Sequence, residues 1–463
     1  MKTASSLKVI IVGAGIGGLT CAIACRREGF EVAVLERASR IVPMGAGMQI
    51  PPNGVKVARQ LGFLDKLQQV ATTLEAIEVR RYDNGKQLGE LTGEQCRTEY
   101  GDPWMAVHRA DFHGTLWRTC QELGVSLELN MEVERIDSEN GTVYMEDGDE
   151  ICGDVIIGAD GTGWRWSPVR KGPRSVSRAQ LLDTPSPLVD TGDVAYRAVL
   201  PVEYLKALND SRVDDLCAQN RAITWLGPNQ HTVLYSVRGG REFNLILIRS
   251  GRGEPGDLHP GGDAGEMRDY FAGWDEILNK ILSLVPRVQK WKICTPPKVD
   301  PASRGCFAIL GDAFHSNLPY QAQGAAMAME DGALLGKILG LARAHVLRGR
   351  GDASDAESSE AQLRDEHRGD VDLKKLVPAA LEAYGAARGA RASAAVRGEG
   401  RTEPVREWFH LPDGPEQEAR DAALSHTDAG DRSAWRDDCL CLLGYDVVRE
   451  AEKVTAAAVL EVI

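Results

Sequence analysis

A short segment near the start of the chain has the composition of a phosphate-binding loop. Residues 13–18 read G-A-G-I-G-G, which fits the pattern G-x-G-x-x-G. Gly13 permits a tight turn, Gly15 lets a pyrophosphate approach the backbone, and Gly18 lets a helix pack closely on a strand. The free N–H groups of the following helix would face the phosphates. The pattern predicts dinucleotide binding; a tight turn without a ligand is the alternative.

A strand, a helix and a second strand must position this loop. Residues 9–12 form a β-branched run, a helical stretch continues to Arg27, and residues 31–35 form a second apolar run. Glu36 ends the second run, where a carboxylate accepts hydrogen bonds from an adenosine ribose. The unit therefore predicts two parallel strands joined by a helix.

Two later segments repeat the pattern of a buried strand that ends in an acid beside glycine. They are residues 154–161, with Asp160, and residues 306–312, with Asp312. Their carboxyl ends are expected to meet near the first glycine loop. Between residues 173 and 295 the pattern changes to alternating strands, such as 232–237 and 244–248. This change predicts a mostly antiparallel sheet inserted into the parallel one.

Composition narrows the class of protein. The chain has 463 residues, a formal net charge of −13, 43% hydrophobic residues and 26% charged residues, as soluble globular proteins do. The acidic balance argues against a nucleic-acid partner. The ten cysteines lack zinc-finger or redox CxxC spacing, which predicts free thiols and no metal site. No apolar run is long enough for a membrane span, and a cytoplasmic location is expected.

A second match to the glycine pattern lies at residues 251–256. Pro255 and the charges around it leave no apolar helix behind this match, which favours a surface loop. The sequence therefore contains a binding motif for one nucleotide cofactor, and a second nucleotide would bind only transiently.

Several motifs together resemble the single-component (class A) FAD-dependent aromatic monooxygenases, most closely the salicylate-hydroxylase-like branch of fungal secondary metabolism. They are GAGIGG at 13–18, GAGMQIPPNG at 45–54, HRADFHGTL at 108–116, GADG at 158–161 and GDAFHSNLPYQAQGAAMAMEDGA at 311–333, and the likeness continues to residues 409–415. The resemblance implies FAD as the resident cofactor, NADPH or NADH as a transient reductant, and O₂ as a co-substrate.

The resemblance also implies which residues hold FAD. Glu36 would bind the adenosine ribose, Arg109 would lie on the flavin side, and Asp160 would lie near the pyrophosphate. Asp312 would bind the ribityl chain or the phosphates, and Pro319 would sit beside the flavin ring. If each residue is considered alone, Arg109 could equally form a surface ion pair, and Asp160 could equally stabilise a turn. The full expected set is Gly13, Gly15, Gly18, Glu36, Arg37, Gly47, Arg109, Asp160, Asp312, Pro319, Gly324 and Ala325.

Two segments depart from the family pattern. After Pro319 the family usually has two glycines, whereas Ala322-Gln323-Gly324 keeps only the second. Residues 162–166 precede Ser167, where the family reaches its serine sooner. Neither departure removes the residues expected to bind FAD.

The run from Gly324 to Leu339 is apolar at helical spacing and predicts a buried helix. Its N-terminus would stabilise negative charge on the reduced flavin by about 0.3–2 kcal/mol. The resemblance implies that the reduced flavin forms a flavin hydroperoxide, and the inserted sheet would keep water from it.

Two residues of the inserted sheet are the catalytic candidates. Arg197 would hold a phenolate or stabilise oxyanion character, and Tyr235 would help to orient the ring. Related phenol hydroxylases use an arginine and a tyrosine on this sheet. A sheet-edge salt bridge for Arg197 and a packed aromatic for Tyr235 are the alternatives. His315 is interpreted as making a loop-orienting hydrogen bond.

The predicted fold is α/β: a Rossmann-type parallel sheet, an inserted mostly antiparallel substrate-domain sheet and a helical C-terminal region. The predicted FAD-binding parts are residues 1–75, 105–172 and 296–345; the substrate-domain parts are 76–104 and 173–295; an acidic loop and helices occupy 346–463. The predicted activity is transfer of one oxygen atom to an electron-rich ring, a phenol or an indole, of a small secondary metabolite. The alternatives are indole 2,3-epoxidation with rearrangement, a flavin oxidase or dehydrogenase, and a non-catalytic flavin-binding scaffold.

Overall fold

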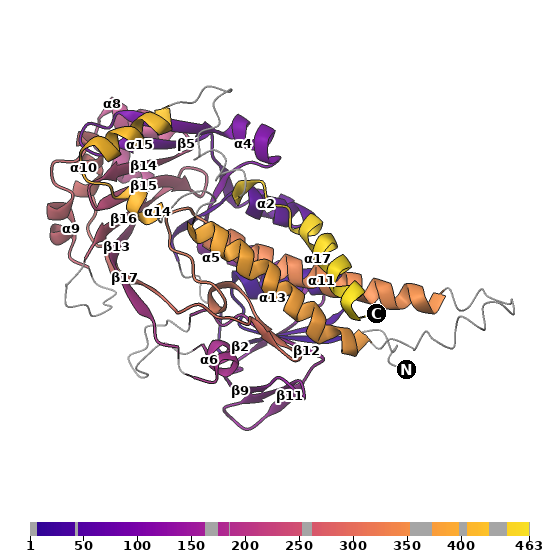
Figure 1. Cartoon of the computed structure of the whole chain (residues 1–463). Coiled ribbons are helices and arrows are strands. Elements are labelled where there is room, and N and C mark those ends of the chain that lie inside the picture. Colours follow the sequence, from indigo (N-terminus) through magenta and orange to yellow (C-terminus); the bar gives the residue numbers. More distant parts are fainter. Residues whose placement is uncertain are drawn as a thin grey trace, which may run out of the picture.

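The computed structural model describes residues 7–41, 45–162, 175–184, 186–251, 262–351, 373–397, 405–425 and 442–462. Three predicted segments fall wholly or mostly outside these ranges: the insertion before Ser167, the second glycine match and the acidic stretch up to residue 372. Two large sheets and a group of long helices make up the described structure (Figure 1).

The first sheet is parallel apart from one short edge strand, as predicted. Its spatial order is β18 (Ser303–Arg304), β19 (Phe307–Ile309), β12 (Val155–Gly158), β1 (Lys8–Val12), β2 (Glu31–Glu36) and β8 (Ser126–Leu129). Because β12 and β19 run parallel to β1, their carboxyl ends lie at the edge of the sheet where the glycine loop begins.

The second sheet is antiparallel except where β14 pairs with β5. Its order is β17 (Gln289–Thr295), β13 (Val189–Pro201), β16 (Glu242–Ser250), β15 (Gln230–Val237), β14 (Arg221–Gly227), β5 (Ala76–Arg81) and β6 (Gln87–Thr92). The helices gathered around this end of the molecule include α7 (Val202–Lys206), α8 (Ser211–Ala218), α9 (Ala264–Tyr270) and α10 (Glu276–Ser283) (Figure 1). We call this sheet the substrate sheet.

Two small sheets complete the strands of the described residues. One contains β3 (Gly47–Ile50), β7 (Met105–His108) and β4 (Ala71–Thr73); the other contains β11 (Glu150–Cys152), β10 (Thr142–Met145) and β9 (Val133–Asp137). Shorter helices connect these elements: α2 (Pro52–Gln60), α3 (Leu64–Gln68), α4 (Gly93–Tyr100), α6 (Val176–Leu182) and the 3-10 turn η1 (Gly311–Ala313).

Long helices lie beside the parallel sheet. They are α1 (Ile16–Arg27), α5 (Arg109–Glu122), α11 (Gly324–Gly351), α13 (Leu373–Arg397) and α17 (Val447–Val462). Helices α1, α5 and α13 contact the strands of the sheet, α11 packs on α1, and α17 packs on α11 and α13. The predicted helix after Gly324 is confirmed as α11. A Cβ on Gly332 would lie 2.6 Å from the Cys21 nitrogen, and one on Gly336 would lie 2.6 Å from the Ala24 Cβ, so only glycines permit the close contact of α11 with α1.

Two short C-terminal helices lie apart from the others, against the substrate sheet. They are α14 (Val405–Phe409) and α15 (Pro415–Ser425), and α15 contacts β6 (Figure 1). The C-terminal part of the chain therefore supports both halves of the molecule.

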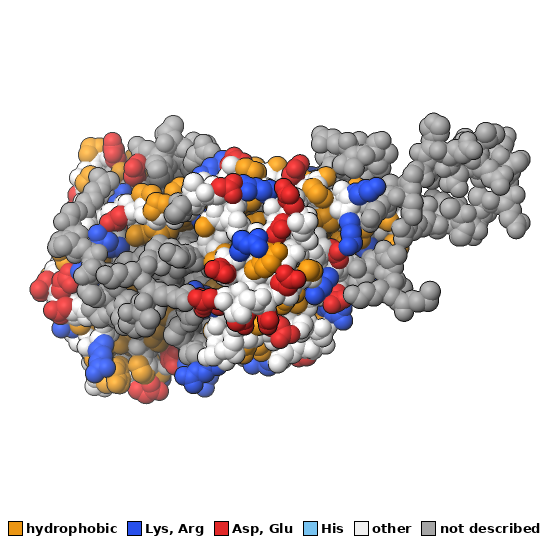
Figure 2. Space-filling model, turned by 90° about the horizontal axis from the view of Figure 1, so that it is seen from below, with side chains coloured by type: hydrophobic (Ala, Val, Ile, Leu, Met, Phe, Trp, Pro, Cys, Tyr) orange, Lys and Arg blue, Asp and Glu red, His pale blue; other side chains and the backbone are white. Residues whose placement is uncertain are grey.

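Charge is mixed on the surface. On the face shown in Figure 2, acidic and basic side chains of the described residues are interspersed and form no large patch of one sign. None of the helices in the described ranges combines the length and apolar character needed to cross a bilayer.

Candidate functional site: a dinucleotide cradle facing the substrate sheet

The glycine loop has the geometry of a cradle. Gly13 has φ +107°, and a Cβ on it would lie 2.6 Å from the Ala159 oxygen. A Cβ on Gly18 would lie 2.1 Å from the Gly13 oxygen, so both positions require glycine. A Cβ on Gly15 would have no neighbour closer than 3.9 Å. The loop therefore packs closely against the backbone at Gly13 and Gly18. Beside Gly15, at the N-terminus of α1, it leaves open space.

Glu36 connects the loop to the end of β2. Its Oε2 accepts a hydrogen bond from the Ala14 nitrogen at 3.0 Å, and its Oε1 accepts one from the Ala38 nitrogen at 2.9 Å. Each carboxylate oxygen has a second lone pair, so Glu36 can still accept from ribose hydroxyls. Arg37 follows as an exposed side chain.

Asp160 lies beside Gly13 at the end of β12. Its carboxylate accepts hydrogen bonds from the Ser175 hydroxyl at 2.7 Å and the Ser177 nitrogen at 3.1 Å. Burial raises the pKa of Asp160, and these hydrogen bonds act in the opposite direction. The side chain thus fastens the start of α6, while its backbone borders the glycine loop.

Asp312 and Arg109 are close enough for their charges to interact. Asp312 is exposed to the solvent, yet burial raises its pKa and the charges of His315 and Arg109 lower it. Asp312 therefore lies at the surface next to these two cationic side chains, where its oxygens remain free to accept hydrogen bonds. Arg109 is exposed, lies against Gly45, and has no ion pair in the described part of the chain, which argues against the surface-salt-bridge alternative.

The loop after η1 has an alanine in a conformation that favours glycine. Ala322 adopts φ +54°, a left-handed conformation that favours glycine and costs an alanine roughly 1–2 kcal/mol. Pro319 is exposed, and a Cβ on Gly324 would meet nothing within 4 Å. The start of α11 therefore borders open space, whereas Ala325 packs partly against the main core.

Buried ionic contacts hold this loop in place. Asn53 donates from Nδ2 to Gln323 Oε1 at 2.9 Å and to Glu330 Oε1 at 2.6 Å. His315 Nε2 lies 2.7 Å from Asp331 Oδ2, but neither ring nitrogen has a partner in hydrogen-bond geometry, so the loop-orienting hydrogen bond stays a prediction. Although burial acts to raise the pKa of Asp331, the charges of His315 and Arg388 lower it to about 2. The sequence analysis missed Asn53 and the acidic pair, although the motifs PPNG and MEDG contain them.

The inner face of the substrate sheet meets this region at Gly47. Tyr235 and Asn244 are directly opposite each other on β15 and β16. The Gly47 nitrogen donates to Asn244 Oδ1 at 2.8 Å, and a Cβ on Gly47 would lie 2.8 Å from the Tyr235 Cε2. Gly47 is thus the point where β3, on the cofactor side, contacts the substrate sheet.

Arg197 is a cation without a carboxylate partner. It lies on β13 opposite Ile246, and its guanidinium carbon is 5.4 Å from the centre of the Trp291 ring. Its Nε is buried without a hydrogen-bond partner, and among the described residues no carboxylate lies within ion-pair distance. Burial lowers the pKa of Arg197, the nearby charge of Arg109 lowers it further, and Tyr235 acts in the opposite direction. Among the described residues, Arg197 therefore does not form the sheet-edge salt bridge that was the alternative interpretation of this residue.

Asn244 is a site residue that the sequence analysis missed. It is fully buried, and its Nδ2 has no hydrogen-bond partner. Because Gly47 supplies a donor, the atom that faces Gly47 must be the oxygen, and the unpaired atom is therefore the NH₂ donor. Tyr235 beside it is 2% exposed, and burial raises its pKa. The sequence signal that could have indicated this residue is a polar asparagine within an otherwise apolar strand.

The predicted residues form three groups. Gly13, Gly15, Gly18, Glu36 and Asp160 surround the glycine loop; Arg109, Asp312, Pro319 and Gly324 belong to the exposed segments beside it; Gly47, Tyr235 and Arg197 lie where the substrate sheet begins. The open space at Gly15 and Gly324 and the exposed carboxylate of Asp312 match what a dinucleotide with an extended ring would contact. The residues present therefore fit FAD.

Comparison with known proteins agrees with this geometry. A family model described as an FAD binding domain matches residues 6–180. The FAD-dependent monooxygenase OpS4 of Beauveria bassiana (strain ARSEF 2860) is 34% identical over 465 residues, which cover 97% of each chain. A 3-amino-4-hydroxybenzoate 2-monooxygenase of Streptomyces cremeus is 30% identical, and the match covers 93% of this chain and 94% of that protein.

Solved structures show the same fold. A salicylate hydroxylase in a substrate complex superimposes with a TM-score of 0.69 at 21% identity, covering 98% of each chain. The fold and the site thus define a flavoprotein oxidoreductase. The chain belongs to the family of single-component (class A) FAD-dependent aromatic monooxygenases, and its cofactor is FAD.

Proposed function

We propose that this enzyme uses NADPH or NADH and O₂ to insert one oxygen atom into an electron-rich aromatic ring of a small secondary metabolite. We further propose that the substrate carries an acidic group, a phenol or a carboxylic acid, on or beside that ring. The observation that supports this proposal is Arg197, a partly buried cation that has no carboxylate partner in the described chain.

An unpaired guanidinium beside an apolar sheet favours an anionic ligand. Burying a charge without a partner is costly, so a phenolate or carboxylate that reached Arg197 would compensate for it. A neutral indole supplies no such charge. Arg197 therefore supports a phenolic or acidic substrate over an indole, and indole epoxidation becomes the second choice.

We assign a role near the bound cofactor to each residue of the site. FAD, once reduced by the nicotinamide nucleotide, supplies the chemistry that activates O₂. Arg197 would hold the substrate anion, and the Asn244 NH₂ would donate to a second oxygen of the ring system. Tyr235 would pack against the ring. Trp291, Leu318 and Tyr320 form an apolar cluster that would exclude water from the pocket.

The proposal is tested by product analysis with isotopically labelled dioxygen. FAD-loaded enzyme is incubated with NADPH or NADH and a panel of phenols, aromatic acids and indoles. We expect one labelled oxygen atom in the product of at least one phenol or acid. Reductant consumption that yields only hydrogen peroxide across the panel contradicts the proposed oxygen transfer, and a label found only in indole products contradicts the acidic substrate.

Arg197→Ala tests the residue itself. We expect the variant to retain FAD and to form product at least tenfold more slowly, equivalent to about 1.4 kcal/mol in barrier. The control is Arg241→Ala, an exposed arginine between β15 and β16. Normal turnover by the Arg197 variant would remove this residue from the site.

A further inference from the structure

Asp193 joins two parts of the chain that are distant in sequence. It is a fully buried carboxylate on β13, on the same face as Arg197 because side chains alternate along a strand. Arg406 of α14 donates two hydrogen bonds to it, from Nε to Oδ2 at 2.5 Å and from Nη2 to Oδ1 at 2.6 Å. The Tyr320 hydroxyl donates to the same carboxylate. Asp193 therefore links the C-terminal segment to the loop that follows Pro319.

Tyr320 belongs to the loop that covers the inner face of the substrate sheet. With Leu318 it packs in an apolar cluster that contains Trp291 and Ile246, and Ile246 is the cross-strand neighbour of Arg197. Residues 315–323 contain no helix or strand, and Ala322 within them holds a left-handed conformation. A segment without regular structure depends on external contacts for its conformation. Gln323 is tied by Asn53 at one end, and Tyr320 is tied by Asp193 in the middle.

A pair of histidines forms a second anchor of the C-terminal segment. His231 Nδ1 on β15 lies 2.8 Å from His410 Nε2, and the Asn229 nitrogen donates to the His410 oxygen at 3.0 Å. The Tyr320 ring packs on both imidazoles, with centroid distances of 5.4 and 5.8 Å. The segment therefore contacts Tyr320 through its ring as well as through Asp193.

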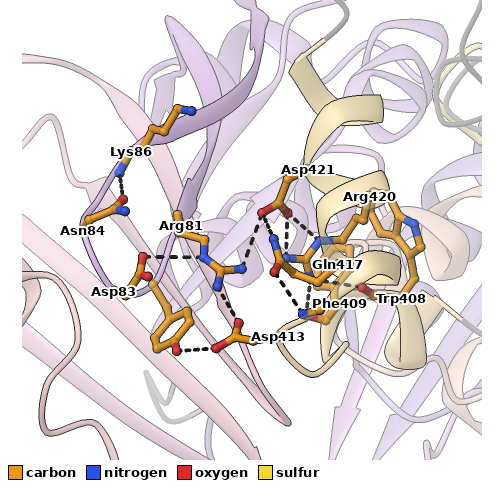
Figure 3. Close-up of polar contacts among 12 residues, drawn as sticks. Arg81, Asp83, Asn84, Lys86, Trp408, Phe409, Asp413, Gln417, Arg420 and Asp421 are labelled. Atoms are coloured by element: carbon orange, nitrogen blue, oxygen red, sulfur yellow. Dashed lines mark hydrogen bonds and ion pairs between the residues drawn. The ribbon is translucent and has the colours of Figure 1, made fainter.

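A third anchor lies at the far edge of the sheet (Figure 3). Arg81 and Tyr82 of the β5 end donate to Asp413, and Arg81 Nη1 also reaches Asp421 at 3.4 Å. Arg420 donates to the backbone oxygens of residues 408 and 409 at 3.3 and 3.2 Å. This anchor attaches the same segment as Arg406 does, but the hydrogen bonds and ion pairs named here do not involve Tyr320.

We propose that residues 405–425 are a clamp that sets the position of the 317–323 loop over the substrate, with Arg406 and Tyr320 as its positioning residues. Arg406 neutralises Asp193, and Asp193 then holds the Tyr320 hydroxyl. Without Arg406 the buried carboxylate would lose this ion pair and would no longer hold a fixed geometry. The clamp rests on the proposed function, because the loop matters for catalysis only if the substrate lies beneath it.

Hydrogen–deuterium exchange of the FAD-loaded enzyme tests the clamp without any substrate. The variants are Tyr320→Phe, which removes one hydroxyl, and Arg406→Gln, which removes the charge. The matched control is Asp413→Asn, which breaks the third anchor of the same segment. We expect exchange of the peptide covering residues 317–323 to rise at least tenfold in the first two variants and to stay near wild type in the control. Unchanged exchange in Tyr320→Phe, or an equal rise in the control, overturns the clamp.

Turnover gives the functional readout. In Tyr320→Phe we expect the ratio of product to NADPH or NADH consumed to fall at least threefold, with hydrogen peroxide making up the difference and FAD content unchanged. Arg406→Lys, which restores the charge, should recover part of that ratio relative to Arg406→Gln. If the wild-type enzyme oxygenates nothing in the panel, the proposed function fails, and the exchange result still decides the clamp on its own.

Discussion

The cofactor end and the substrate end of this enzyme are built differently. At the cofactor end, backbone groups fix the shape of the site: the Gly13 nitrogen donates to the Leu35 oxygen, and both Glu36 oxygens accept from backbone N–H groups. At the substrate end, Arg197 and Asn244 come from two different strands, and each has a buried polar atom without a partner.

This difference indicates which end of the molecule binds a ligand common to many enzymes and which end selects a particular ligand. Backbone groups of a glycine loop recognise a diphosphate that is the same in every FAD enzyme, so they need no variable side chain. An unsatisfied buried donor costs about 1–3 kcal/mol until a ligand supplies its acceptor. We therefore expect the substrate end to discriminate between ligands and the cofactor end to bind FAD alone.

Gly18→Ala should give the largest effect, at the cofactor end. The new Cβ would lie 2.1 Å from the Gly13 backbone oxygen, so we expect a loss of about 3 kcal/mol or more in the free energy of unfolding. Gly15→Ala is the control, since its nearest neighbour would be 3.9 Å away. It should keep the stability of FAD-free protein and lose FAD. Urea unfolding and flavin retention measure both; equal destabilisation by the two substitutions would show that the loop is not a cradle.

The second effect concerns pH at the substrate end. Burial lowers the pKa of His231 well below its usual value and that of His410 to about 4. A base whose pKa is depressed on folding stabilises fully above its unfolded pKa near 6.5, and this stability is lost as the pH falls below it. Asp193, Arg406, Arg420 and Tyr320 face the pair.

From pH 7.5 to pH 5 we expect His410 to account for about 2 kcal/mol of lost stability, at 1.36 kcal/mol per pKa unit. His410→Gln should remove that part of the slope. Urea unfolding of wild type and variant at the two pH values measures it, and parallel losses in both proteins would exclude the histidine pair as the cause.

Glu36→Ala should have the next effect, confined to the cofactor. The carboxylate accepts from Ala14 and is placed to accept from a ribose, so we expect FAD to bind about tenfold more weakly, or about 1.4 kcal/mol. Titration of FAD-free protein with FAD measures the change. The relative rates on different substrates should not change once the variant is saturated with FAD, and unchanged cofactor content would contradict the ribose role.

Asn244→Asp should have the smallest effect on catalysis and change substrate preference, although the newly buried carboxylate also lowers the stability of the fold. It keeps the acceptor for the Gly47 nitrogen, removes the unpaired NH₂ donor and adds a negative charge on the face that carries Arg197. We expect kcat/KM for acidic substrates to fall about fivefold relative to neutral ones, about 1 kcal/mol. Asn244→Leu, which also loses the contact with Gly47, serves for comparison. An equal fall for all substrates would assign Asn244 to packing alone.

Much of the fold was predictable from local pattern. The strands around the glycine loop, the hairpin of β15 and β16, and the helix from Gly324 follow from periodicity and glycine placement, and the structure confirms them. The loop at Ala322 was harder, since the glycine expected by resemblance is missing and only the structure shows φ +54° there. The exact domain boundaries stay a prediction.

The sequence by itself determined the cofactor end, because residues 13–36 contain the loop, the helix and the acid in one contiguous unit whose geometry is local. Only the tertiary structure decided the substrate end. Whether a buried arginine or asparagine has a partner depends on side chains from other strands, and whether Arg406 reaches Asp193 depends on how segments more than two hundred residues apart come together. Local pattern carries no information on such pairings, since packing and charge neutralisation settle them only in the folded chain.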